Sequence, residues 1–221
     1  MRSQIELQAG LAAILAVAPV VPVVIIEDIA DAVPLAQALI AGGLPVIEVT
    51  LRTKAGLEAI RTIAKLDGAI VGVGTVLEAS QLEAAKQAGA QFAVSPGATK
   101  RLLDAAQVHD IPILPGIATA SEAIALIERD FKFAKFFPAE PAGGAAYLAA
   151  LASPLPQLKF CPTGGISLNN ASRYLALPNV VCVGGSWMLQ RDHISAKDWG
   201  AIRTASSAAK ALGPNENWIR T

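Results

Sequence analysis

Pro45-Val46-Ile47-Glu48-Val49-Thr50-Leu51 is a run in which apolar and polar residues alternate from Ile47 onward, and the helical pattern Leu57–Leu66 follows it. This is the pattern of a β-strand followed by a helix. The same pattern returns about every 20 to 25 residues, and eight such units can be counted. The predicted strands are Val20–Ile26, Pro45–Leu51, Ala69–Thr75, Phe92–Ser95, Ile111–Leu114, Phe133–Phe137, Lys159–Pro162 and Val180–Val183. The helical patterns between them include Ala32–Ala41, Leu57–Leu66, Ser80–Ala88, Lys100–Val108 and Ser121–Glu128.

Eight alternating strand-helix units predict an α/β protein, a single (β/α)8 TIM barrel in which helices surround parallel strands. An open doubly wound sheet shows a similar alternation, but no Gly-x-Gly-x-x-Gly motif opens a helix after the first strand. The length of 221 residues suits one domain of this kind. Residues 1–19 are expected to form an N-terminal helix or leader, and residues 213–221 a C-terminal tail.

The composition narrows the class of protein. Apolar residues make up 53% of the chain and charged residues 16%, with a formal net charge of zero. This excludes a disordered chain and indicates strands that are buried on both faces. There is no basic stripe or polybasic patch, so neither nucleic acid nor a membrane surface is an expected partner. Reduced thiols at Cys161 and Cys182 fit a cytoplasmic enzyme, and the widely separated His109 and His193 do not predict a metal centre.

The longest apolar run, Leu11–Ile26, is shorter than the roughly 20 residues that a membrane span needs. It contains Pro19 and Pro22, and the residues before it, with Glu6 and only Arg2, make a weak positive leader for a signal peptide. A short helix followed by a buried strand is the better interpretation.

Lys135 lies among apolar neighbours in the run Phe133-Ala134-Lys135-Phe136-Phe137-Pro138. Burial disfavours the charged form of a lysine and leaves part of the population as the free amine, which attacks carbonyl carbons. This favours a lysine that forms a Schiff base. The alternative is a lysine that extends from an apolar strand and keeps its ammonium group in water.

The second predicted strand carries a further candidate pair. Ile47, Val49 and Leu51 share one face, which is expected to contact helices, whereas Glu48 and Thr50, followed by Arg52, share the other face. An acid and an arginine inside a sheet must pair or meet a charged ligand, because an unpaired buried charge is costly. The alternative is a structural ion pair between Glu48 and Arg52.

Two glycine pairs follow the last two predicted strands. Pro162-Thr163-Gly164-Gly165 follows the seventh strand, and Gly184-Gly185-Ser186-Trp187 follows the eighth. Turns without a Cβ let backbone N–H groups approach an anion, and the loops after the last two strands of such barrels commonly hold phosphate. These pairs predict a phosphorylated substrate, to which Ser186 adds a hydroxyl or the amide of a helix N-terminus.

Several stretches together resemble the 2-keto-3-deoxy-6-phosphogluconate (KDPG) aldolase family, in order and at the family's spacing from about Val20 to Trp187. They are Val46-Ile47-Glu48-Val49-Thr50-Leu51-Arg52-Thr53, Gly72-Val73-Gly74-Thr75-Val76, Ser95-Pro96-Gly97, Lys135-Phe136-Phe137-Pro138-Ala139-Glu140, Cys161-Pro162-Thr163-Gly164-Gly165-Ile166 and Gly184-Gly185-Ser186-Trp187. The resemblance implies a class I aldolase of the Entner-Doudoroff pathway, usually a homotrimer, that needs no cofactor and no metal.

Within this resemblance, Lys135 is the Schiff-base lysine, Glu48 the general acid/base and Arg52 the partner of the substrate carboxylate. Lys132 has the opposite parity on its strand and is expected to lie away from the site. The remaining implied positions divide into two groups. The pyruvate half is lined by Thr75, Pro96, Phe137 and Thr163, and the phosphate is held by Gly164, Gly165, Gly185 and Ser186.

Some alternatives remain open on the sequence. Family members often also cleave 4-hydroxy-2-oxoglutarate, and the galactonate epimer of the sugar acid is a further candidate substrate. A phosphosugar isomerase or epimerase would use Glu48 without a covalent lysine, and an inactive barrel would only bind a phosphorylated metabolite. The chain diverges from the family before Val20 and after residue 212, where Trp218 is expected to contact its own barrel.

Overall fold

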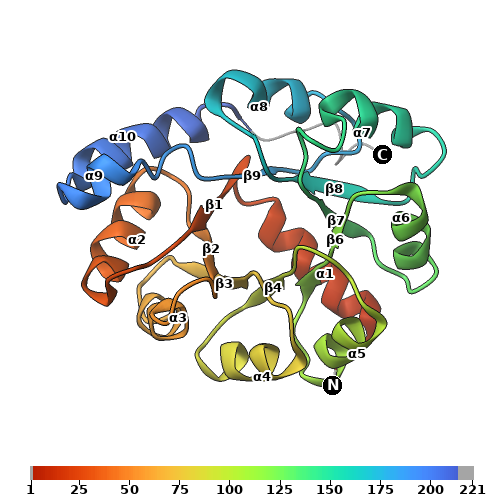
Figure 1. Cartoon of the computed structure of the whole chain (residues 1–221), viewed down its shortest axis with the longest axis horizontal. Helices are drawn as coiled ribbons and strands as arrows, with labels where there is room; N and C mark the ends of the chain where they lie inside the picture. Colours follow the sequence, from red (N-terminus) through yellow and green to blue (C-terminus); the bar gives the residue numbers. More distant parts are fainter. Residues whose placement is uncertain (1, 214–221) are drawn as a thin grey trace.

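The computed structural model describes residues 2–213 and forms an α/β fold (Figure 1). The strands are β1 (Val20–Val24), β2 (Val46–Thr50), β3 (Ile70–Gly74), β4 (Phe92–Val94), β5 (Ile113–Leu114), β6 (Gly116–Ile117), β7 (Phe133–Phe136), β8 (Lys159–Pro162) and β9 (Val183–Gly185). The helices are α1 (Gln4–Leu15), the 3-10 helix η1 (Ile29–Asp31), α2 (Ala32–Ala41), α3 (Gly56–Ile63), α4 (Ala79–Gln87), α5 (Lys100–Val108), α6 (Ala120–Ile127), α7 (Gly144–Ala152), α8 (Leu168–Leu175), α9 (Arg191–Ser195) and α10 (Trp199–Lys210).

The strands are parallel and curl around a common interior. One sheet has the order β5-β4-β3-β2-β1-β9, and a second has the order β6-β7-β8. Two isolated parallel bridges, Phe160 with Val180 and Thr163 with Gly184, link the chain of β8 to that of β9. In Figure 1 the strands surround the centre and helices α2 to α8 and α10 lie outside them. The carboxyl ends of all strands therefore meet on one side of the molecule, where side chains from distant parts of the sequence come together.

The two faces of β2 confirm the predicted alternation. Ile47 and Val49 belong to the large apolar core between the strands and the surrounding helices. Val46, on the opposite face, belongs to a smaller apolar cluster in the interior. Glu48 shares this inward face, so the acid predicted to point inward does so.

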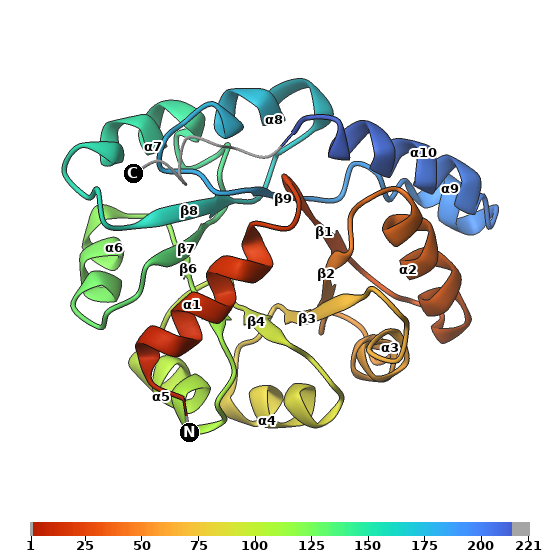
Figure 2. The ribbon, with the colours of Figure 1, turned by 180° about the vertical axis from the view of Figure 1, so that it is seen from behind.

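Helix α1 crosses the open amino-terminal end of the strands, as seen from behind in Figure 2. It begins with a capping box in which Ser3 and Glu6 exchange hydrogen bonds with each other's backbone amides. Leu11 and Leu15 insert from this helix into the interior cluster, which also contains Phe92 from β4. The apolar run Leu11–Ile26 is thus the end of a helix followed by a buried strand, as predicted, and no helix in residues 2–213 is long and apolar enough to cross a membrane.

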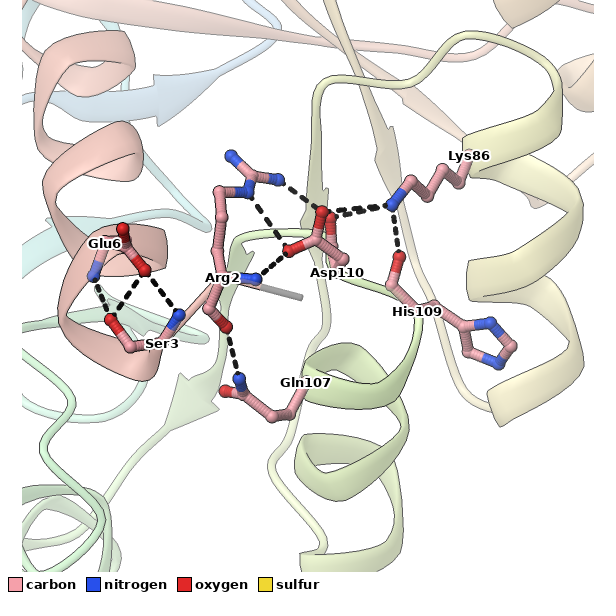
Figure 3. Close-up of polar contacts among 7 residues, drawn as sticks. All are labelled: Arg2, Ser3, Glu6, Lys86, Gln107, His109 and Asp110. Atoms are coloured by element: carbon pink, nitrogen blue, oxygen red, sulfur yellow. Dashed lines mark hydrogen bonds and ion pairs between the residues drawn. The ribbon is translucent and has the colours of Figure 1, made fainter.

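The chain before α1 is fixed to the loop between α5 and β5 (Figure 3). The backbone amide of Arg2 donates to Asp110 Oδ1 over 2.9 Å, and Arg2 Nε donates to the same oxygen over 3.1 Å. Lys86, from α4, donates through Nζ to the carbonyl oxygens of His109 and Asp110 at 2.6 and 3.0 Å. These contacts tie the start of the chain to two peripheral helices and hold α1 beneath the interior.

Most predicted strands lie within two residues of the observed limits, and the fifth and eighth differ further. The fifth, Ile111–Leu114, begins two residues later as β5, and a separate strand β6 follows Pro115, which has no N–H to donate to a sheet. The eighth, Val180–Val183, begins three residues later as β9 and continues through Gly185. The helices at 32–41 and 100–108 match their predicted limits. The predicted tail beyond Gly213, with Trp218, lies outside the described residues.

Candidate active site

The side chains of Lys135 and Glu48 meet in the interior. Lys135 extends from β7 and Glu48 from β2, two strands that belong to different sheets. Lys135 Nζ lies 3.3 Å from Glu48 Oε1, and the two side chains are only 5% and 4% exposed. The structure thus brings together two residues that are 87 positions apart in the sequence.

Small residues make room for this pair. A Cβ placed on Gly74, in β3, would lie 2.4 Å from Glu48 Oε1, which is closer than real contacts allow. Gly116 is the neighbour of Lys135 across β6 and β7, and a Cβ there would lie 2.2 Å from the backbone of Pro96. Glycine at these two positions lets the acid and the turn after β4 approach the centre.

The surroundings of Lys135 and Glu48 exclude two alternatives: a lysine that keeps its ammonium group in water and a structural ion pair between Glu48 and Arg52. Lys135 is 4% exposed, so its amine does not extend into water, and it lies 5.4 Å from the centre of the Phe137 ring. Glu48 pairs with Lys135, and no ion pair joins it to Arg52 among residues 2–213. Lys132 is exposed at the start of the same strand, as its parity predicted. A buried lysine-carboxylate pair is costly to assemble, because both charges lose their hydration.

Arg52 and Thr75 lie at the carboxyl ends of β2 and β3. Arg52 is exposed in the turn after β2, and its Nε donates to Thr75 Oγ1 over 3.3 Å. Thr75 has a φ of 58°, in the left-handed region that β-branched residues rarely adopt. Such a conformation costs about 1 to 3 kcal/mol and is concentrated at functional sites. Pro96 lies in the next turn, two residues after β4.

The turn after β8 packs directly on the turn after β7. Gly164 and Gly165 have φ values of 101° and 80°, so this turn needs residues without a Cβ. Thr163, buried just before them, donates its backbone amide to Phe136 and accepts a hydrogen bond from the amide of Ala139. The predicted glycine turn after the seventh strand is confirmed as a backbone feature.

The second glycine pair differs from its prediction. Gly184 and Gly185 are strand residues of β9, paired with Val21 and Pro22 of β1, and they do not form a turn. They lack side chains because a Cβ on Gly184 would lie 2.3 Å from Thr163 Oγ1, and one on Gly185 would meet a Trp187 ring. Ser186 is exposed after the strand and is not at a helix N-terminus, since α9 begins at Arg191.

A cavity of about 620 Å³ extends from Ser186 toward the chain between β1 and α2. Its polar lining combines both signs of charge, including an ion pair between Lys197 and Asp31. The lining residues are Val23, Ile25, Ile26, Glu27, Asp31, Leu35, Ser186, Leu189, Arg191, Ile194, Ser195 and Lys197. The candidate phosphate end thus adjoins a cavity at the rim of the fold. No group of three or more histidine, cysteine or acidic side chains suited to a metal ion is found within the described residues.

One contact was not anticipated from the sequence. The hydroxyl of Tyr174, on α8, donates to Glu140 Oε1 in the turn after β7. Glu140 ends the motif Lys-Phe-Phe-Pro-Ala-Glu, and its sequence context predicts no role for it. The only signal in the sequence is its position in the turn after the strand that carries Lys135.

The curled parallel sheet and its buried lysine-carboxylate pair define a protein equipped for covalent carbonyl chemistry. The family model for "KDPG and KHG aldolase" matches residues 11–205. This chain therefore belongs to the KDPG and KHG aldolase family, and it is an aldolase, a carbon-carbon lyase.

Individual relatives agree with this assignment. The KHG/KDPG aldolase of Escherichia coli K12 is 52% identical over 190 residues, which are 86% of this chain and 89% of that protein. The 2-dehydro-3-deoxy-phosphogluconate aldolase of Pseudoalteromonas atlantica is 50% identical over 194 residues, or 87% and 90% of the two chains. Among solved structures, the Legionella pneumophila KDPG aldolase with pyruvate captured as a covalent carbinolamine superposes with a TM-score of 0.87 at 44% identity. The superposition covers 90% of this chain and 97% of the Legionella chain.

Proposed function

We propose that this chain is a class I aldolase that cleaves 2-keto-3-deoxy-6-phosphogluconate to pyruvate and glyceraldehyde 3-phosphate in the Entner-Doudoroff pathway. The observation that carries the proposal is the buried contact between Lys135 and Glu48, 3.3 Å apart. A nucleophile and a carboxylate that can take up or return a proton lie side by side, as covalent catalysis requires. The names of the curated relatives support the choice of substrate.

In the proposed reaction, the uncharged amine of Lys135 attacks the C2 ketone, and loss of water gives an iminium. Glu48 removes the proton of the C4 hydroxyl, and the electrons of the C3–C4 bond move into the iminium as the bond breaks. Glyceraldehyde 3-phosphate leaves, and an enamine of pyruvate remains on the lysine. Protonation of the enamine carbon and hydrolysis then release pyruvate and restore the amine.

The remaining residues bind the two ends of the substrate in this scheme. Arg52 holds the carboxylate, because a guanidinium can donate two parallel hydrogen bonds and so fixes the ketone relative to the lysine. The pyruvate half is lined by Thr75, Pro96, Phe137 and Thr163. The phosphate contacts the backbone at Gly164, Gly165 and Gly185 and the side chain of Ser186.

We also propose that the two sheets form one closed (β/α)8 barrel in which β5 and β6 act as a single strand. The bridges between the chains of β8 and β9 support closure on one side. On the other side, the backbone amide of Lys135 donates to the carbonyl of Pro115, which lies between β5 and β6. The family resemblance further supports a cytoplasmic homotrimer built as one domain.

The proposal is tested by incubating the enzyme with pyruvate and sodium borohydride and mapping the modified residue by mass spectrometry. We expect one stable adduct on Lys135 and none in Lys135→Ala. Lys132, three residues earlier and exposed, is the internal control and should stay unmodified. An adduct on another lysine, or none on the intact enzyme, would contradict the Schiff-base mechanism.

A second substrate is favoured by a specific observation, since the Escherichia coli relative at 52% identity is named KHG/KDPG aldolase. 4-Hydroxy-2-oxoglutarate has the same keto acid end and lacks the phosphate. We expect this chain to cleave it through the same lysine with a higher KM. The ratio of kcat/KM for the two substrates measures what the phosphate end contributes.

A further inference from the structure

We propose that Glu140 and Tyr174 are positioning residues that hold the Gly164–Gly165 turn in place for the substrate phosphate. This inference rests on the proposed function, because it assigns the two residues to the phosphate half of that site. Neither side chain needs to touch the substrate. They act by joining three segments: the turn after β7, the turn after β8 and helix α8.

The first link is between the two turns. The backbone amide of Glu140 donates to the carbonyl of Gly164 over 3.0 Å, and the amide of Ala139 donates to the carbonyl of Thr163 over 2.8 Å. A Cβ on Gly165 would lie 2.7 Å from the Cβ of Glu140, so this glycine packs directly against it. The position of the phosphate turn is therefore set by the chain that follows Lys135.

The second link fixes that chain to α8. Tyr174 is 1% exposed, and its hydroxyl is the donor to Glu140 Oε1. Burial, together with the hydrogen bond to Glu140 and its charge, raises the pKa of Tyr174 well above the usual value, so the hydroxyl keeps its proton. Asn170, also on α8, donates to the carbonyl of Gly165 over 3.0 Å. Helix α8 thus contacts the glycine turn directly through Asn170 and indirectly through Tyr174 and Glu140.

The geometry separates this contact from the keto acid end. Lys135 and Glu48 meet deep in the interior, whereas Glu140 is exposed at the rim, five residues beyond Lys135. Loss of the contact should loosen the turn that binds phosphate and leave imine formation intact. A looser turn binds the phosphate less tightly, because the turn must then be ordered on binding.

The test compares three variants on the phosphorylated substrate and on 4-hydroxy-2-oxoglutarate. Tyr174→Phe removes the donor and keeps the buried ring. Glu140→Leu removes the acceptor oxygen and should raise KM for the phosphorylated substrate as Tyr174→Phe does. Tyr147→Phe is the matched control, since Tyr147 stacks on Phe136 from the neighbouring α7 and its hydroxyl has no hydrogen-bond partner among the described residues.

We expect Tyr174→Phe to raise KM for the phosphorylated substrate about 3- to 10-fold, the effect of one lost hydrogen bond. Its kcat, its KM for 4-hydroxy-2-oxoglutarate and its borohydride trapping with pyruvate should match those of Tyr147→Phe. Equal changes on both substrates, or no change on either, would overturn the positioning role. Absence of trapping in the wild type would instead refute the proposed function, so the two failures are distinguishable.

Discussion

Two lysine-carboxylate pairs of almost the same length lie in different parts of the molecule, one in the interior between the strands and one near the amino ends of the strands. Lys135 and Glu48 are 3.3 Å apart with side chains 5% and 4% exposed. Lys86 and Asp110, near the amino ends of β4 and β5 (Figure 3), are 3.4 Å apart with side chains 44% and 29% exposed. Water screens the second pair and is excluded from the first. The attraction between the charges is therefore stronger in the buried pair, although the two distances are nearly equal. Burial distinguishes the pair that we propose to be reactive from the exposed pair that anchors the start of the chain.

The backbone also differs between the amino and carboxyl ends of the strands. Asp110 has a φ of 54° and Thr75 a φ of 58°, so each end contains a residue in the left-handed region. Aspartate tolerates this conformation because its short side chain can hydrogen-bond locally, whereas a β-branched residue is strained in it. The strained Thr75 follows the carboxyl end of β3, and the buried charges of Lys135 and Glu48 lie in the interior between the strands; we place catalysis between these two features.

Replacement of the two lysines is expected to give the largest contrast. Lys135→Met should abolish turnover, because no amine remains to form the imine. It should also lower the free energy of unfolding by about 3 kcal/mol at neutral pH, since Glu48 then lies buried without a partner. Lys86→Met should leave kcat and KM unchanged and cost little stability, as is usual for exposed pairs. Urea unfolding and steady-state kinetics measure both effects. Equal stability losses in the two variants would mean that burial does not distinguish the pairs.

Glu48→Gln separates imine formation from bond cleavage. The amide cannot accept a proton from the C4 hydroxyl, so we expect the rate of cleavage to fall about 10²- to 10⁴-fold. The adduct with pyruvate and borohydride should still form on Lys135. Rapid-quench measurement of cleavage and mass spectrometry of the adduct provide the two readings. An unchanged cleavage rate would remove Glu48 from its proposed role.

Much of this contrast was visible in the sequence. Alternation in β2 placed Glu48 inward, and the apolar run around Lys135 indicated a buried amine; the structure confirms both positions. Inward direction follows from a period of two, which is a local property. That these two side chains meet was implied by the family resemblance and was not derivable from spacing, because the distance between strands depends on how the sheet curls.

The differences between the predicted and the observed structure have local physical causes. The strand β6 beyond Pro115 was not predicted, because Gly116–Ile117 is too short to show an alternating pattern. Gly184 and Gly185 were taken for a turn, whereas they are strand residues whose small size admits Thr163 and Trp187. Glycine has two uses, positive φ and close packing, and a sequence does not distinguish them. The contact between Glu140 and Tyr174 joins residues 34 positions apart and had no periodic signature.

The strain at Thr75 gives a smaller effect. Asparagine tolerates the left-handed conformation, so Thr75→Asn should raise the free energy of unfolding by about 1 kcal/mol. It removes the hydroxyl that accepts from Arg52 and should raise KM for the keto acid about fivefold. Asp130→Asn, at a φ of 61° in an exposed turn, is the control and should change stability by less than about 0.5 kcal/mol. A Thr75→Asn enzyme that is less stable than the wild type would show that the conformation is not strained.

The smallest effect concerns the pH dependence of stability that arises from the contact between Arg2 and Asp110. The backbone amide of Arg2, followed by its guanidinium, lowers the pKa of Asp110 from 3.8 to about 2. A carboxyl group whose pKa is lower in the folded state stabilises the protein above its unfolded pKa, and this contribution is lost as the pH falls through the folded value. Asp110→Asn keeps a residue that tolerates positive φ and removes only the charge. We expect its urea midpoint to lie below that of the wild type at pH 6, and the difference to shrink between pH about 4 and about 2. A difference that stays constant over this range would mean that the ionised carboxylate does not stabilise the amino-terminal anchor.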